Sequence, residues 1–180
     1  MTRVLLILAN LVLWPLTFLF FVIAVPLVVL LLVIFGPVRV DFAVRWMCRM
    51  IVRLGGARVV TEFAEPLDTN RTRIYISNHV NLFDPFVLGG VTPRLRGLEL
   101  ESHFKIPIYG ALMRWVGNVP VSDERTPAAL KRTYRLMREA RDLGLNVCVF
   151  PEGTRTRDGS VGPFATGGFR MARQLGVPLT

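Results

Sequence analysis

Two side chains with complementary chemistry stand five positions apart in the first half of the chain, His79 and Asp84. A histidine can accept a proton from an attacking hydroxyl near neutral pH. A carboxylate bonded to its other ring nitrogen fixes the tautomer and stabilises the imidazolium. The pair follows a β-prone run, Ile74–Ser77, and precedes a helix-prone run that opens at Pro85. Since α/β folds build their sites at the ends of strands, this spacing predicts a general base and its orienting group.

The same residues also have a purely structural interpretation. Asp84 before Pro85 is a favourable helix start, with aspartate as N-cap and proline at the first helical position. Asn78 and Asn81 suit turns for local reasons. On this interpretation, the stretch would begin a helix and have no catalytic role.

A second polar block favours the catalytic interpretation. Residues 150–155 read Phe-Pro-Glu-Gly-Thr-Arg and follow another strand-like apolar run, Leu145–Phe150. Two polar loops that end two buried strands predict one shared pocket.

Together the two blocks resemble the glycerophospholipid acyltransferases, a family that includes lysophosphatidic acid acyltransferase. The resemblance is carried by Asn-His, four residues and Asp at positions 78–84, followed by the block at 150–155. Each block alone is common, whereas the pair in this order is specific. The resemblance extends from about residue 40 to the last residue given.

The resemblance implies a role for each matched residue. His79 would deprotonate a glycerol hydroxyl of the acceptor as it attacks a thioester, with Asp84 orienting the ring and without an acyl-enzyme. Gly153 and Arg155 would bind the acceptor phosphate, because a guanidinium bonds two phosphate oxygens and a glycine lets the backbone approach. The other substrate-binding residues implied are Asn78 and, as residues that shape the loop, Glu152 and Thr154.

Two further family blocks are matched less well. Gly117–Arg125 resembles a block in which a glycine is followed by a phosphate-binding arginine, but Pro120 stands where an aromatic is common, and Arg125 lies two positions further out. Arg125 is nevertheless a candidate substrate-binding residue. Val177–Leu179 resembles the opening of a last block, so we expect the acyltransferase domain to be truncated at its C-terminal end.

Alternating short apolar and helical runs predict an α/β fold. The expected architecture is a single domain with a central, mostly parallel or mixed sheet flanked by helices. Strands are expected at residues 57–62, 73–77, 95–100, 118–121 and 145–150, with another from Val177, and helices at 85–91, 108–116, 126–143 and 165–175.

An apolar segment precedes this domain. Val4–Val38 contains no charged residue and is too long for a soluble core helix. As one helix it would measure about 50 Å against a hydrocarbon core of about 30 Å, so it must tilt, lie partly in the interface or break, with Pro15 and Pro26 as break points. A single span near Leu16–Phe35 and a two-helix hairpin both remain open. A signal peptide is excluded by the length of the run.

The segment from Arg39 to Leu54 has the pattern of an amphipathic helix at the membrane surface. Arg45, Arg49 and Arg53 recur every fourth residue and form one stripe. Because the arginines follow the apolar run, the positive-inside bias predicts a cell-membrane protein whose catalytic domain faces the cytoplasm. The expected divisions are 1–38 for the membrane segment, 39–56 for the interfacial helix and 57–180 for the acyltransferase domain.

The charge and composition of the chain indicate which kinds of partner it binds. The net charge is +9, and apart from Lys105 and Lys131 every basic residue is an arginine, which implies an anionic partner. Membrane lipids, phosphate substrates and an acidic acyl donor explain this better than nucleic acid, since no aromatic-interleaved basic motif is present. Cys48 and Cys148 sit in apolar runs and are interpreted as reduced packing residues.

The residue inventory argues against other chemistries. A metallohydrolase would need more ligands than His79, His103 and scattered carboxylates, so no metal site is predicted, and neither a Gly-x-Ser-x-Gly elbow nor a nucleotide-binding loop is present. We expect acyl transfer from acyl-carrier protein or coenzyme A to a lysophospholipid, most simply 1-acylglycerol 3-phosphate, with no cofactor. The alternatives are another acceptor, such as glycerol 3-phosphate or lyso-ornithine lipid, and an inactive lipid-binding module at the membrane surface.

Overall fold

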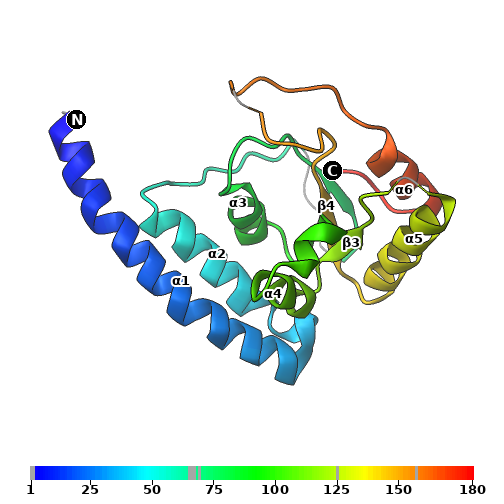
Figure 1. The fold of residues 1–180 in the computed structure, drawn as a ribbon, viewed down its shortest axis with the longest axis horizontal. Helices are drawn as coiled ribbons and strands as arrows, with labels where there is room; N and C mark the ends of the chain where they lie inside the picture. Colours follow the sequence, from blue (N-terminus) through cyan, green and yellow to red (C-terminus); the bar gives the residue numbers. More distant parts are fainter. Residues whose placement is uncertain (1–2, 65–67, 69, 125, 157) are drawn as a thin grey trace.

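The structure, a computed structural model, describes residues 3–64, 68, 70–124, 126–156 and 158–180 (Figure 1). In chain order its elements are α1 (Arg3–Arg39), α2 (Asp41–Leu54), β1 (Ile74–Ile76), α3 (Asp84–Val91), β2 (Leu95–Leu100), the 3-10 helix η1 (Glu101–Lys105), α4 (Tyr109–Val116), β3 (Val119–Val121), α5 (Pro127–Asp142), β4 (Asn146–Val149) and α6 (Gly167–Leu175).

The four strands form one parallel sheet in the order β1-β4-β2-β3. This confirms the predicted α/β class. In the central strands, Tyr75 of β1 and Gly97 of β2 both pair with Cys148 of β4, so these three residues form one row across the sheet. Because every pairing is parallel, the loops that leave the carboxyl ends of the strands gather at one edge.

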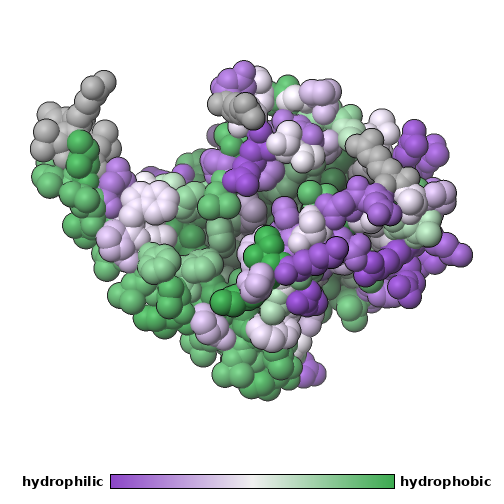
Figure 2. Space-filling model, viewed as in Figure 1, coloured by the Kyte–Doolittle hydropathy of each residue, from purple (hydrophilic) through white to green (hydrophobic). Residues whose placement is uncertain are grey.

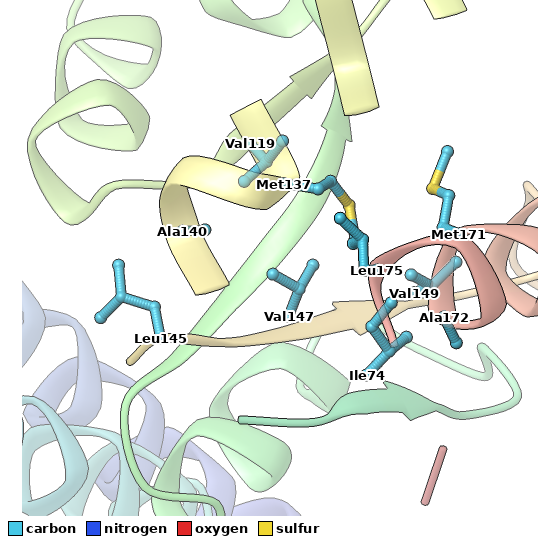
Figure 3. Packing of buried hydrophobic residues seen from close by; sticks show 10 residues of the cluster. All are labelled: Ile74, Val119, Met137, Ala140, Leu145, Val147, Val149, Met171, Ala172 and Leu175. Atoms are coloured by element: carbon cyan, nitrogen blue, oxygen red, sulfur yellow. The ribbon is translucent and has the colours of Figure 1, made fainter. Parts of the chain in front are cut away.

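Helices α5 and α6 cover one face of the sheet. Figure 3 shows Met137 of α5 and Leu175 of α6 directed toward Val147 of β4. All four residues of β4 are buried although their side chains alternate between the two faces, so both faces are covered. The full apolar cluster on this side comprises Ile74, Val119, Met137, Ala140, Leu145, Val147, Val149, Met171, Ala172 and Leu175.

Two of the predicted strands differ from the structure. Residues 57–63 have irregular backbone, so the strand expected at 57–62 is wrong; Val60, for example, is 73% exposed. This segment links α2 to the sheet over the surface. Its residues are β-prone, but its backbone does not pair with a neighbouring strand. The strand expected from Val177 is reduced to one parallel bridge, between Leu179 and Ile74.

The apolar segment forms one helix that turns back at its end. α1 continues through Pro15 and Pro26, the two candidate break points, and its backbone leaves helical angles only at Gly36 (φ 77°, ψ 165°). That φ is in the range that favours glycine. α2 then runs back alongside α1 in Figure 1, with Phe20 and Trp46 in edge contact at 5.7 Å. The hairpin therefore forms between α1 and α2, not within residues 1–38.

The α1–α2 hairpin is fastened to the sheet by a buried guanidinium. Arg96 of β2 is 1% exposed, and its Nη2 donates to the carbonyl of Pro37 at 3.2 Å. From the other side, the buried carboxylate of Asp41 accepts the backbone N–H of Arg94. Charged groups are buried only where they are paired, so these bonds fix the hairpin relative to the domain.

The arginine stripe of α2, formed by Arg45, Arg49 and Arg53, makes contacts within the protein and is also partly exposed at the surface. Arg45 pairs with Asp41 at 3.0 Å, and Nε of Arg49 donates to the carbonyl of Gly90 in α3 at 2.7 Å. Arg53 is exposed. The Nε bond of Arg49 holds α2 against α3, and the position of this helix at the membrane surface stays a prediction.

The outer side of α1 is apolar along its length. Among the described residues, Ile7–Arg39 is the one helix long and apolar enough to cross a membrane by length and composition. Large side chains such as Leu11, Phe18 and Ile23 are more than half exposed, and Figure 2 shows the hydrophobic surface gathered over this part of the molecule. An apolar surface of this extent is typical of a membrane-binding region.

We therefore expect the full chain to sediment with membranes and to remain there in high salt, because salt screens charges but leaves apolar burial intact. Membrane fractionation with and without salt measures this, and release of most of the protein by salt alone would contradict it. Protease access to an N-terminal tag separates the two arrangements. If protease added on the side of the domain does not cleave the tag, the N-terminus lies across the membrane and the segment is a single span. If that protease cleaves the tag, the segment is a hairpin that enters and leaves the membrane by one face.

Candidate active site

The predicted pair is formed in the loop between β1 and α3. Nδ1 of His79 lies 2.7 Å from Oδ2 of Asp84, and their side chains are 19% and 17% exposed. This is hydrogen-bond distance for a charge-assisted contact. With Nδ1 bonded to the carboxylate, Nε2 is the ring nitrogen left to face a substrate hydroxyl.

The carboxylate of Asp84 also closes the loop. The same Oδ2 accepts the backbone N–H groups of Val80 at 2.7 Å and Asn81 at 2.9 Å. The helix N-cap is Phe83, and Asp84 is the first residue of α3. The interpretation of Asp84 as N-cap is therefore wrong, because its side chain reaches back to the loop and not forward to the helix.

The His79 ring is packed on its face and tethered through its backbone. It stacks on Phe150 with the ring centroids 4.1 Å apart and the planes 17° from parallel. Its carbonyl accepts the N–H of Thr156 at 2.9 Å. These contacts tie the imidazole to the second polar block, as a shared pocket requires.

Glu152 joins the two loops. Oε1 accepts the N–H of His79 at 2.9 Å, and Oε2 accepts the N–H of Gly162 at 3.0 Å. Both of its carboxylate oxygens are thus bonded to backbone groups. In the structure Glu152 positions the histidine loop, a role that local sequence did not indicate.

The rest of the second block lies open to solvent. Gly153 has φ 70°, and its N–H closes the turn onto the carbonyl of Phe150 at 3.1 Å. A side chain at Gly153 would meet no atom within 4 Å, so its outer side is open space. Thr154 and Arg155 are exposed. The backbone of Gly153 and the guanidinium of Arg155 are therefore open to a ligand.

The remaining predicted residues have different outcomes. Asn78 is half-buried next to His79, and its carbonyl accepts Oγ of Ser77 at 3.0 Å. Arg125 lies outside the described residues. The thiol of Cys148 is buried, and burial raises its pKa to about 12, as expected of a packing residue. Within the described part of the chain, no group of three His, Cys, Asp or Glu side chains could hold a metal ion.

The structure adds a polar cluster that the sequence did not reveal. Glu99, His103, Tyr109 and Asn118 come from β2, η1, α4 and the residue before β3, and they bond to one another through Glu99. The i,i+4 spacing of Glu99 and His103 was the available signal, but sequence alone did not show a strand giving way to a 3-10 helix there.

Comparison with known proteins identifies the family of this chain. The family model "Acyltransferase" matches residues 58–180. A 1-acyl-sn-glycerol-3-phosphate acyltransferase of Haemophilus influenzae is 32% identical over 145 residues, covering 80% of this chain and 60% of that protein. The chloroplastic enzyme of the same name from Brassica napus, BAT2, is 36% identical over 109 residues, or 59% of this chain and 30% of that one.

A solved structure has the same fold. The crystal structure of the 1-acyl-sn-glycerophosphate acyltransferase PlsC from Thermotoga maritima superposes with a TM-score of 0.70 at 26% identity, covering 94% of this chain and 71% of that one. The chain spans 60% or less of the length of the two curated relatives. With the family model matching from residue 58 onward and with its two polar blocks in one site, this chain belongs to the acyltransferase family.

Proposed function

We propose that the protein transfers a fatty acyl group from a thioester of acyl-carrier protein or coenzyme A to the free hydroxyl of 1-acylglycerol 3-phosphate, giving phosphatidic acid. The observation that carries the proposal is the 2.7 Å contact between His79 and Asp84 in a loop that Glu152 ties to the block containing Arg155. It joins the loop of the candidate base to the block that carries the cation of Arg155. A relative that is 32% identical in sequence carries the name 1-acyl-sn-glycerol-3-phosphate acyltransferase, and the solved structure with the same fold is that of a 1-acyl-sn-glycerophosphate acyltransferase.

The proposed reaction is a direct transfer. Nε2 of His79 removes the proton of the acceptor hydroxyl as its oxygen attacks the thioester carbonyl. The C–S bond breaks as the new C–O ester bond forms, and the proton leaves His79 with the thiolate as free thiol. Asp84 holds the ring by Nδ1 and stabilises the imidazolium between these steps.

The open second block supports binding of the acceptor phosphate. A planar guanidinium bonds two oxygens of a phosphate at once, and Arg155 is exposed beside a glycine whose outer side is empty. Acyl-carrier protein and coenzyme A are both anionic, and the net charge of +9 on this chain attracts them. We place the domain at the cytoplasmic face of the membrane, on the basis of the arginines that follow the apolar segment.

A panel of acceptors tests the proposal. The membrane-bound chain is given one acyl thioester, and thiol release is followed with 1-acylglycerol 3-phosphate, glycerol 3-phosphate and lyso-ornithine lipid. The proposal requires the highest kcat/KM for 1-acylglycerol 3-phosphate. Preference for another acceptor would reassign the substrate, and release with none of them would favour an inactive lipid-binding module.

Replacing Arg155 by alanine is expected to raise the KM for a phosphate-bearing acceptor about tenfold or more while changing the KM for the donor much less. Arg155→Lys should recover part of the loss, since lysine keeps the charge but not the planar fork. Steady-state kinetics with each substrate varied in turn measure both. Arg138→Ala removes an exposed arginine from α5 and serves as the control. Equal losses for both substrates would instead assign Arg155 a folding role.

A further inference from the structure

Glu99 is the centre of a hydrogen-bonded cluster at the carboxyl end of β2. Oε1 accepts Nδ1 of His103 at 3.0 Å and the hydroxyl of Tyr109, and Oε2 accepts Nδ2 of Asn118 at 3.3 Å. The Glu99 side chain is 16% exposed and that of His103 is 46% exposed. A carboxylate that binds one nitrogen of a half-exposed imidazole repeats the arrangement of Asp84 and His79.

Sheet register places this cluster next to the proposed catalytic pair. The last pair between β2 and β4 is Gly97 with Cys148. Extending this register by two residues, one past the end of β4, brings Glu99 level with Phe150. Side chains two apart on a strand share a face, and neighbouring strands lie about 4.8 Å apart. On this extended register Glu99 and Phe150, the residue that follows β4, fall on the same face of the sheet, and Phe150 is the ring on which His79 stacks.

Arg155 is close enough to act on the same cluster. Burial raises the pKa of Tyr109, as do its hydrogen bond to Glu99 and the charge of that carboxylate, whereas the positive charge of Arg155 lowers it. His103 is in edge contact with Tyr109, the ring centroids being 6.4 Å apart. His103 therefore contacts Tyr109 directly, and the positive charge of Arg155 acts on the same phenol.

We propose that His103, held by Glu99, binds the phosphate of the acceptor together with Arg155. This inference rests on the proposed function. A phosphate monoester has three terminal oxygens, and a guanidinium occupies two of them. With Nδ1 bound to Glu99, a protonated His103 ring presents its second N–H, at Nε2, to the third. Glu99 acts through His103 and is a positioning residue.

The competing explanation is structural, because the same bonds also fasten η1 and α4 to β2. Gly110 shows how closely these elements pack, since a side chain there would come within 2.0 Å of the carbonyl oxygen of Phe104. A structural role would make Glu99 and His103 matter equally for every acceptor. A headgroup role would make them matter only when a phosphate is present.

Direct binding without a donor separates these explanations and does not depend on turnover. The full chain in lipid vesicles is titrated with 1-acylglycerol 3-phosphate and with 1-acylglycerol, which has no phosphate. We expect His103→Gln to raise the Kd for the phosphate ligand about ten- to a hundredfold and to leave the Kd for 1-acylglycerol unchanged. Glu99→Gln should act in the same direction with a smaller factor, since the single amide oxygen can still accept the bonds from His103 and Tyr109 but carries no charge.

Two matched variants control for charge. Glu101→Gln removes a carboxylate two residues from Glu99 that pairs with Arg132, and Lys105→Gln removes a cation from η1 that lies near Asp123. Both should bind the two ligands as the wild type does. Equal weakening for both ligands in His103→Gln, an unchanged Kd for the phosphate ligand, or a wild type that does not prefer that ligand would each overturn the inference. Tight, phosphate-dependent binding without acyl transfer would contradict only the proposed function.

Discussion

His79→Ala is expected to lower kcat about 10²- to 10⁴-fold, because in the proposed reaction the imidazole is the base that takes the hydroxyl proton. The KM for the acceptor should change little, since the phosphate contacts lie elsewhere. The loop should survive, because its bonds to Glu152 and Thr156 use the backbone of residue 79 and not its ring. The measurements are steady-state kinetics and thermal unfolding on membrane-bound protein. A folded variant with kcat within about threefold of the wild type would exclude His79 as the base.

Asp84→Asn is expected to remain folded and membrane-bound while kcat falls about 10²-fold or more. The asparagine oxygen can still accept the N–H groups of Val80 and Asn81, so the loop retains its closure. The missing charge can no longer stabilise the imidazolium. Asp84→Ala should lose turnover and stability together, because both backbone donors are then left without an acceptor.

Asp142→Asn provides the control for Asp84→Asn, since it removes an exposed carboxylate at the end of α5. Its kcat should equal that of the wild type. Near wild-type turnover in a folded Asp84→Asn protein would show that Asp84 only closes the loop.

Local signals explain why much of the fold could be predicted. Residues 95–100 form β2 as expected, and Thr126 caps α5 by accepting the N–H of Ala129 at 3.2 Å, with Pro127 in the first turn. Strand patterns and helix caps depend on neighbours in sequence, so they are visible without a structure. The His79–Asp84 contact belongs to the same class, since it spans a single loop.

The differences arise where distant residues decide the outcome. Residues 57–62 are β-prone but do not pair with a neighbouring strand, and the helix continues through Pro15 and Pro26 before it turns at Gly36. Strand pairing and helix packing depend on tertiary contacts, which the conformational preferences of single residues do not predict.

The site itself shows the same limit. The carboxylate of Glu152 accepts the N–H of His79, although the two residues are 73 positions apart in the sequence. The four residues of the Glu99 cluster come from four separate parts of the fold. The parallel sheet brings these residues to one edge, and only the strand order β1-β4-β2-β3 reveals which loops are neighbours. Sequence therefore indicated the candidate pair His79 and Asp84, and the structure supplied the residues that position it.

The central claim is direct acyl transfer from a thioester to 1-acylglycerol 3-phosphate, with His79 as the base. The most direct measurement gives the membrane-bound chain an isotope-labelled acyl thioester, with and without this acceptor, and quantifies free thiol and labelled phosphatidic acid together. We expect thiol release only when the acceptor is present, one labelled phosphatidic acid for each thiol, and loss of both in His79→Ala. Thiol release that does not need the acceptor, or thiol without labelled phosphatidic acid, would contradict the account.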